Sequence, residues 1–404
     1  MMSIKPLEIL DKVTTAVFAL TIAFSFCGLF LVPSGQSILS NLLVVSGVLG
    51  LLNYFIGGKK EVLFTDRRLI WIFVFYATVI LINRIIHGDQ YGVMRDLFYV
   101  SVFSLMMPRK KILFSVGCIA ILIGGIGLGL LSLWQYENGI VRVEGFTNAI
   151  LFSQSALTLV ILNWCLFIRA RKVCWVKTGS LVSITASLLA LYLSQSRGVW
   201  LALGAVIGLL IIYKSLYKPL KYAFITLLLV ALAGGLYQTN TIVQGRMAEA
   251  VSDIKGIEGG TYYSSWGLRV VAWESAWLGF LESPLIGVGT DGFTAVKEQQ
   301  ISQGLVSPLV MDPALAHAHS QYMQNLIIRG AVGILALAIF LFYPMKLLVE
   351  RAGWGSPYTM IPLSFAVSAL SDVPFEHQNT LYLYALSLVF CWCAIEFNME
   401  KKAS

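Results

Sequence analysis

The amino-acid sequence predicts an all-α polytopic membrane protein with about twelve transmembrane helices. Three observations predict this fold class: the composition, a series of long apolar runs, and a single long polar segment. Of the 404 residues, 57% are hydrophobic and only 12% are charged, and the mean hydropathy is +0.78. Soluble domains usually contain about 25% charged residues, so this composition excludes a water-soluble globular protein.

Twelve apolar runs are candidates for spanning helices, which need about 20 residues each. They cover residues 13–31, 37–56, 68–86, 94–107, 112–134, 150–169, 174–194, 198–213, 219–237, 322–348, 357–372 and 378–397. The fourth and eighth are short. Boundaries are marked by Pro108, Pro219 and Ser356-Pro357, because proline interrupts helices. No cleavage-site pattern follows the first run, which predicts a retained first helix rather than a signal peptide.

The basic residues predict the topology. With both termini on the cytoplasmic side, twenty of the 29 Lys and Arg residues fall in inside segments, such as Lys59-Lys60, Arg109 to Lys111 and Arg171-Lys172. The other basic residues lie in outside segments or in a span: Arg84, Arg95, Arg142, Arg197, Arg246, Lys255, Arg269, Lys297 and Arg329. This distribution obeys the positive-inside rule. It also explains the net charge of +8 without a nucleic-acid partner.

Residues 238–321 are too long and too polar for a turn and fall on the outside. They divide the chain into helices 1–9 (residues 1–237), an outside cap of amphipathic helices (238–321), and helices 10–12 with a cytoplasmic tail (322–404). In the stretch LRVVAWESAWLGFLESP the apolar residues Val270, Trp273, Trp277 and Phe280/Leu281 recur at helical spacing. Tryptophan suits the membrane interface, so we expect this helix to lie on the bilayer.

Outside arginines near the membrane are candidate anion-binding residues. Arg197 lies in the short turn SQSRGVW, where it could clamp an anion with the N-terminus of the next helix, or simply extend toward the interface. Arg269 could be a second clamp, or could pair with Glu274 or with lipid headgroups. Arg142 and Arg95 could contact substrate or be ordinary loop residues, and for Arg84 the loop role is favoured.

Two of the four histidines, His317 and His319, stand just before the tenth apolar run. If a helix begins at position 319, His319 shares one helix face with Gly330 and Gly333, because 3.6 residues make a turn. That places His319 on a closely packed helix, as a candidate general base. His317 could be structural. Asp372, after the eleventh run, could orient a histidine or pair with an arginine.

A metal site is not expected. No further His or Cys is expected to be available near the histidine pair, no Asp-x-Asp occurs, and the six cysteines show no CxxC spacing. No phosphate-loop or dinucleotide fingerprint is present, so neither a cofactor nor a nucleotide is expected.

Several motifs resemble the O-antigen ligase and polymerase family. They are Ser-Gln-Ser-Arg197-Gly198, the stretch from Arg269 to Trp273, the loop Glu282 to Gly289 with Phe293, and His319-Ser320 followed after nine residues by Gly330-Ala-Val-Gly333. The motifs lie between residues 194 and 333, in the order found in the family. Twelve spans and a long outside loop before the tenth also fit that family.

The resemblance implies a GT-C-like glycosyltransferase in the inner membrane of a Gram-negative bacterium, with its active site facing the periplasm. Such an enzyme moves O-antigen from undecaprenyl pyrophosphate to a hydroxyl of lipid A-core. His319 then corresponds to the essential histidine, as general base, and Arg197 and Arg269 correspond to the arginines that bind pyrophosphate. Asp372 is similar to an acidic residue of the family. We expect a metal-independent reaction that inverts the anomeric configuration.

Four alternatives remain. An O-antigen polymerase and a protein O-oligosaccharyltransferase use the same donor with another acceptor. A twelve-span transporter would place charges near mid-membrane and show paired repeats, whereas here almost no charges lie mid-span apart from Arg329 and no repeat is visible. A receptor or assembly scaffold would leave the outside arginines and histidines without a role.

Overall fold

The computed structural model describes residues 4–58, 61–63, 66–170 and 173–403, and these form an almost purely helical protein. The long helices are α1 (Ile4–Cys27), α2 (Gly35–Phe55), α3 (Arg68–His87), α4 (Tyr91–Met106), α5 (Lys111–Glu137), α6 (Ala149–Arg169), α7 (Cys174–Leu193), α8 (Arg197–Ser215), α9 (Pro219–Thr239), α10 (Thr241–Glu258), α11 (Ser265–Glu282), α12 (Gly289–Ser302), α13 (Gln321–Ala352), α14 (Met360–Ser368) and α15 (Gln378–Ala403). No β-strand occurs among the described residues, which confirms the all-α prediction.

Every predicted span coincides with a helix, but two of the helices are short. Among the described residues, ten helices are long and apolar enough to cross a membrane. The predicted fourth span is α4, with 16 residues, and the predicted eleventh is α14, with only 9. Lys59, Lys60, Arg171 and Lys172, which supported the predicted topology, lie outside the described residues.

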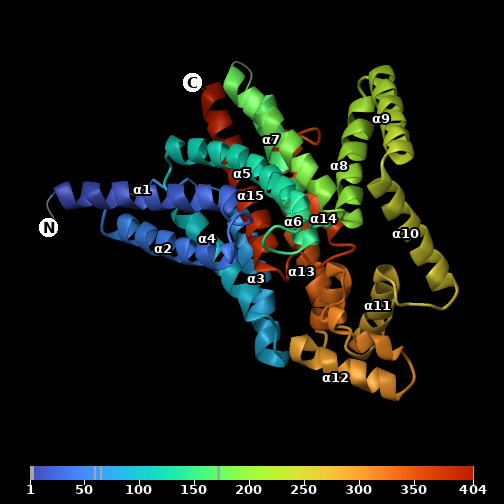
Figure 1. The fold of residues 1–404 in the computed structure, drawn as a ribbon. Helices are drawn as coiled ribbons and strands as arrows, with labels where there is room; N and C mark the ends of the chain where they lie inside the picture. The colour runs from blue at the N-terminus through green and yellow to red at the C-terminus, as the bar shows by residue number, and fades with distance from the viewer. Residues whose placement is uncertain (1–3, 59–60, 64–65, 171–172, 404) are drawn as a thin grey trace.

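The centre of the bundle is formed by α6 and α15 (Figure 1). The most apolar windows of these helices are 83% and 89% buried, respectively. Helices α8 and α9 stand side by side at the right of Figure 1, and no residue of α9 is buried. An apolar helix without a buried face is suited to lipid, so α9 forms an outer edge of the molecule.

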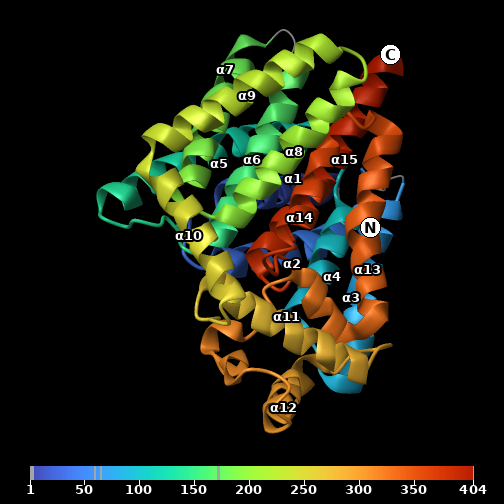
Figure 2. The same ribbon diagram turned by 90° about the vertical axis from the view of Figure 1, so that its right-hand side faces the viewer.

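Helices α10, α11 and α12 follow α9 and gather toward one end of the bundle (Figure 2). The buried face of α11 consists of small residues, including Gly267, Ala272 and Gly279, and α11 packs against α13. Trp277 and Leu281 of the predicted apolar face are 48% and 56% exposed. The predicted helix is therefore present, and part of its apolar stripe faces away from the protein.

A break at Gly330 divides α13 into two parts. Gly330 has φ 60° and ψ −153°, a combination essentially restricted to glycine. The loop between α11 and α12 docks into the break: the amide nitrogens of Ala331 and Val332 donate to the carbonyl oxygens of Pro284 and Leu285, at 2.8 and 3.2 Å. Because of the break, these two amides have no acceptor within the helix. An unpaired amide is costly in a membrane, and the carbonyl oxygens of the loop supply the missing acceptors.

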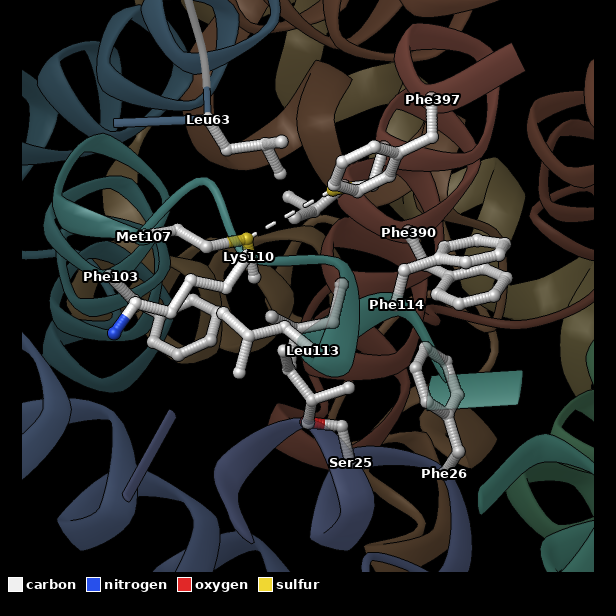
Figure 3. A pocket seen from close by; sticks show the side chains of 14 residues that line it. Ser25, Phe26, Leu63, Phe103, Met107, Lys110, Leu113, Phe114, Phe390 and Phe397 are labelled. Atoms are coloured by element: carbon white, nitrogen blue, oxygen red, sulfur yellow. Dashed lines mark hydrogen bonds between the residues drawn. The ribbon is translucent and has the colours of Figure 1, made fainter. Parts of the chain in front are cut away.

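An apolar pocket lies elsewhere in the bundle, between α1, α4, α5 and α15 (Figure 3). Phe114 stacks on Phe390 beside it, with ring centroids 5.2 Å apart. Its lining includes one charged residue, Lys110, whose Nζ is paired 2.6 Å from an Asp11 carboxylate oxygen. None of the candidate site residues lines this pocket.

Candidate active site

The turn between α7 and α8 presents Arg197 at the first position of α8. Gln195 takes the left-handed conformation in this turn, with φ 54°. Gly198 follows, and a Cβ there would lie 2.2 Å from the Ser371 Oγ. Glycine is therefore needed for α8 to approach the loop after α14. The family-like turn thus holds Arg197 against residues more than 170 positions later in the chain.

The Arg197 guanidinium is only partly satisfied within the protein. Its Nη2 lies 2.9 Å from the Asp253 Oδ2 of α10. Its Nη1 is buried without a hydrogen-bond partner among the described residues. Because a buried donor without an acceptor costs free energy, such an atom is a candidate contact for a bound anion.

Arg269 extends from α11 to the loop after α14. Its Nε donates to the Ser371 carbonyl oxygen at 3.3 Å, and its Nη1 donates to the Ser265 Oγ at 2.7 Å. Arg269 thus binds Ser371 and Ser265 rather than Glu274, the partner considered for it from the sequence. Burial lowers the pKa of Arg269; Asp372 opposes this effect, and the charges of Arg197 and Arg142 reinforce it. The guanidinium nonetheless stays charged at neutral pH.

Arg142 is brought to the same place by the loop before α6. Its Nε donates to the Ser194 carbonyl oxygen at 3.2 Å, next to the turn that carries Arg197. Burial lowers the pKa of Arg142, and the nearby charges of Arg246 and Arg197 lower it further. Three arginines that are distant in sequence, Arg142, Arg197 and Arg269, thus share one electrostatic environment.

His319 lies beside this group, but not on a helix. Helix α13 begins at Gln321, and His319 has φ 47°, so the predicted helix through position 319 is wrong. The expected alignment of His319 with Gly330 and Gly333 fails for a second reason, since the break at Gly330 interrupts the helical count. Left-handed backbone at a non-glycine residue is uncommon, and histidine is among the residues that tolerate it best.

The hydrogen bonds of His319 fix its tautomer. Nε2 lies 2.7 Å from the Ala314 carbonyl oxygen, and a carbonyl can only accept, so Nε2 carries the proton. Nδ1 is buried and has no partner among the described residues. Burial lowers the pKa of His319; the Ala314 hydrogen bond opposes this shift, and Arg269 adds to it. At neutral pH the ring is therefore neutral, with Nδ1 free to accept a proton.

His317 has a different environment. Its Nδ1 accepts a hydrogen bond from the His319 backbone amide at 3.3 Å, and the two rings lie 4.2 Å apart. Burial lowers the pKa of His317 to about 3, and the neighbouring His319 adds to this shift. His317 therefore stays neutral and supports the backbone turn that carries His319.

The loop after α14 closes the site and carries Asp372. The Gln154 Nε2 of α6 donates to the Asp372 Oδ2 at 2.9 Å. The Asp372 carbonyl oxygen accepts from the Gln321 amide at the start of α13, also at 2.9 Å. His377 of the same loop brings its ring to 5.8 Å from that of His317.

The expectation that no further histidine lies near the pair is thus wrong in three dimensions, because His377 approaches His317 from another part of the chain. Within the described residues, no group of three or more His, Cys, Asp or Glu side chains could hold a metal ion. Metal independence stays a prediction.

Two of the outside arginines have other partners. Arg95 pairs with Asp96 of its own helix at 3.2 Å and lies over the rings of Tyr91 and Tyr99. Arg84 donates to the Asp89 carbonyl oxygen. The partners of Arg95 are thus residues of its own helix rather than the site around Arg197 and Arg269. The bond from Arg84 to the neighbouring loop residue Asp89 agrees with the loop role favoured for Arg84.

Arg329, which lies inside the predicted tenth span, is 1% exposed. It forms two hydrogen bonds with Asp89, at 2.7 and 2.9 Å, and a third contact of 3.2 Å with Glu376. This ion-paired cluster joins α13 to the α3–α4 turn and to the loop that carries Asp372. It is a structural connection rather than an open binding site.

Sequence reasoning missed Asp253, Gln154 and His377. A signal existed for Asp253, since it follows Arg246 by seven residues on a predicted amphipathic helix and so shares its face. Gln154 lies within an apolar run and carried no such signal.

The chemistry that this arrangement favours is recognition of an anion beside a neutral base. Among the buried side-chain nitrogens that have no acceptor in the described residues, three lie close to the arginines described above: the Arg197 Nη1, the Arg246 Nε and the Trp273 Nε1. The charge of Arg269 in turn acts on His319. The apolar helices, together with this polar, positively charged site, are typical of one class of protein: multi-pass membrane proteins with a site for an anionic ligand.

Comparison with known proteins relates part of the chain to one family within this class. Residues 181–338 match the family model described as O-Antigen ligase, and this match supports assigning the chain to the O-antigen ligase family. The matched region contains Arg197, Arg269 and His319. The chain is also 24% identical over 360 residues to an uncharacterized protein of Haemophilus influenzae, which covers 84% of this chain and 87% of that protein. The family match supports a glycosyltransferase of the ligase or polymerase type.

Proposed function

We propose that this protein is an O-antigen ligase that transfers O-antigen polysaccharide from undecaprenyl pyrophosphate to a hydroxyl of lipid A-core. The single observation that carries the proposal is the neutral His319 ring, with an unpartnered Nδ1, beside Arg142, Arg197 and Arg269. Transfer of a sugar from pyrophosphate requires a base for the acceptor hydroxyl and, next to it, positive charges that bind the departing pyrophosphate.

In the proposed reaction the His319 Nδ1 takes the proton of the acceptor hydroxyl. The hydroxyl oxygen attacks the anomeric carbon, a new glycosidic bond forms, and the bond from that carbon to the pyrophosphate oxygen breaks. Undecaprenyl pyrophosphate leaves with the bonding electrons. Arg197 and Arg269 stabilise its negative charge by charge-assisted hydrogen bonds. Direct displacement inverts the anomeric configuration, so a product with the donor's configuration contradicts this route.

The proposed setting is the inner membrane of a Gram-negative bacterium, with both termini cytoplasmic and the site facing the periplasm. No nucleotide is needed, because the donor carries its own leaving group. Residues 238–321 then form a periplasmic cap between spans nine and ten. Arg142 joins the pyrophosphate contacts, Asp372 orients the histidine region, and His317 supports His319.

The decisive experiment replaces His319 by Ala and examines lipopolysaccharide on a gel. Removal of a general base costs about 10²–10⁴-fold in rate, so we expect long O-antigen ladders to disappear while the protein remains inserted. The matched control is His317→Ala, which should reduce ligation less, since the His317 Nδ1 is occupied by the His319 amide. Persisting ladders in His319→Ala contradict the proposal.

An O-antigen polymerase and a protein O-oligosaccharyltransferase share this donor and differ only in the acceptor. Purified protein supplied with one donor and with lipid A-core, lipid-linked glycan or acceptor protein in turn distinguishes the three. Transfer to lipid A-core alone is the result expected for the ligase.

A further inference from the structure

Helix α10 is held on the candidate site by a charged residue rather than by an apolar face. Asp253 is the single buried residue of α10, and its carboxylate is the partner of Arg197. The two side chains are 12% and 21% exposed, respectively, so the pair is largely removed from water. Helices usually dock through apolar stripes, so attachment through an ion pair requires another explanation.

The rest of α10 and the helix before it are weakly attached. Met247, Val251 and Ile254, at helical spacing on another face of α10, are each at least half exposed. Helix α9, which precedes α10, has no buried residue. A hydrogen bond of 2.9 Å from the Tyr192 hydroxyl to the Asn240 side chain anchors the joint between them. This joint and the contacts of α10 with α11 leave a helix that can pivot when the Asp253 pair separates.

The position of the Asp253 carboxylate coincides with the proposed ligand contact. Carboxylate and phosphate oxygens accept the same hydrogen bonds from a guanidinium. The Nη2 of Arg197 already donates to Asp253, whereas its Nη1 is buried without a partner. A diphosphate that uses the whole Arg197 fork must therefore displace Asp253.

We propose that Asp253 occupies the diphosphate position in the ligand-free protein, and that α10 is a lid which diphosphate binding releases from Arg197. This inference rests on the proposed function. The exchange replaces a single carboxylate charge near Arg142, Arg197, Arg246 and Arg269 by the larger charge of a diphosphate. The stronger attraction of the arginines for the diphosphate offsets the loss of the ion pair between Asp253 and Arg197. Helix α10 therefore moves only when a ligand with sufficient negative charge binds.

The test uses the full chain purified in detergent, with inorganic pyrophosphate as the probe and calorimetry at low ionic strength. Asp253→Asn removes the competing charge and keeps the side-chain size. We expect the dissociation constant of this variant for pyrophosphate to fall on the order of tenfold, because binding no longer has to break the ion pair between Asp253 and Arg197. Glu258→Gln removes the same charge from an exposed position of the same helix and should bind like the wild type.

Hydrogen exchange of residues 243–258 measures the lid directly. In the wild type, pyrophosphate should accelerate exchange of these amides; in Asp253→Asn, exchange should be fast without ligand. Asp253→Glu, which keeps the charge, controls for loss of folding and should retain slow exchange. Weaker or unchanged pyrophosphate binding by Asp253→Asn, with binding abolished in Arg197→Ala, overturns the lid and leaves the anion site intact. Absence of binding in both the wild type and Asp253→Asn overturns the diphosphate assignment itself.

Discussion

His319 illustrates how a residue's chemistry depends on its immediate contacts. The Ala314 carbonyl oxygen fixes the proton on Nε2 and leaves Nδ1 available. His317, two residues earlier, has its Nδ1 occupied by a backbone amide. Sequence spacing predicted different roles for these two histidines, which stays a prediction, and it assigned His319 to a helix that begins only at Gln321.

The protonation of His319 predicts the pH dependence of the reaction. Burial, as the largest effect, lowers the pKa of this ring below the ordinary value of 6.5. A general base works in its neutral form, so activity is retained while the pH falls through 6.5 and is lost only below it. The measurement is kcat/KM for transfer to lipid A-core as a function of pH. An acid limb centred above 6.5 contradicts a buried neutral His319 as the base.

At the scale of elements, the break in α13 can be tested by adding a single methyl group. A Cβ at position 330 would lie 2.5 Å from the Leu285 carbonyl carbon, on a residue with φ 60°. Gly330→Ala should therefore lose about 1–3 kcal/mol from strained backbone alone. The expected result is a clearly lower midpoint of thermal unfolding in detergent.

Gly204→Ala is the matched control for that substitution. Gly204 lies within α8, and a Cβ there meets no atom within 4 Å. Alanine is favoured over glycine in a helix, so stability should be unchanged or slightly higher. Equal loss in both variants would mean that the conformation of Gly330 is not the cause.

The elements could be predicted from sequence because each long helix is recorded locally, as an apolar run ended by proline, glycine or charge. The break at Gly330 could not, since it depends on Pro284 and Leu285, each 47 residues before its partner, accepting hydrogen bonds from the amides of Ala331 and Val332. The shortness of α14 was missed because the apolar sequence continues past Ser368 into Ala369 and Leu370, which the structure places in a turn.

At the scale of the whole molecule, the site is assembled from distant segments. The loop before α6, the α7–α8 turn and the loop after α14 each supply one charged group near Arg269 of α11, which in turn lies near His319. These residues could be picked out from the sequence as candidates, because charges on the predicted outer face of an apolar protein are scarce. Their mutual partners could not, and Arg95, which looked equivalent to Arg142, is paired with Asp96 instead.

The orientation of the whole molecule leads to a further prediction. The distribution of basic residues predicts that both ends of the chain lie in the cytoplasm. A green fluorescent protein fused after Ser404 should therefore fold and fluoresce in cells, because this reporter matures in the cytoplasm and fails after export in the unfolded state. A matching fusion truncated after Thr239, at the end of α9, places the reporter on the opposite side and should stay dark. Fluorescence from the shorter fusion alone reverses the topology.

The repaired break in α13 also has a consequence for biosynthesis. The ribosome makes residues 283–288 before it makes Ala331 and Val332. The carbonyl oxygens of this earlier loop accept the hydrogen bonds that the amides of Ala331 and Val332 donate. The acceptors are therefore already synthesised when the interrupted span leaves the insertion machinery. Chain order alone thus protects this span from exposing unpaired amides to lipid, and a circular permutant that delivers α13 first would lose that protection.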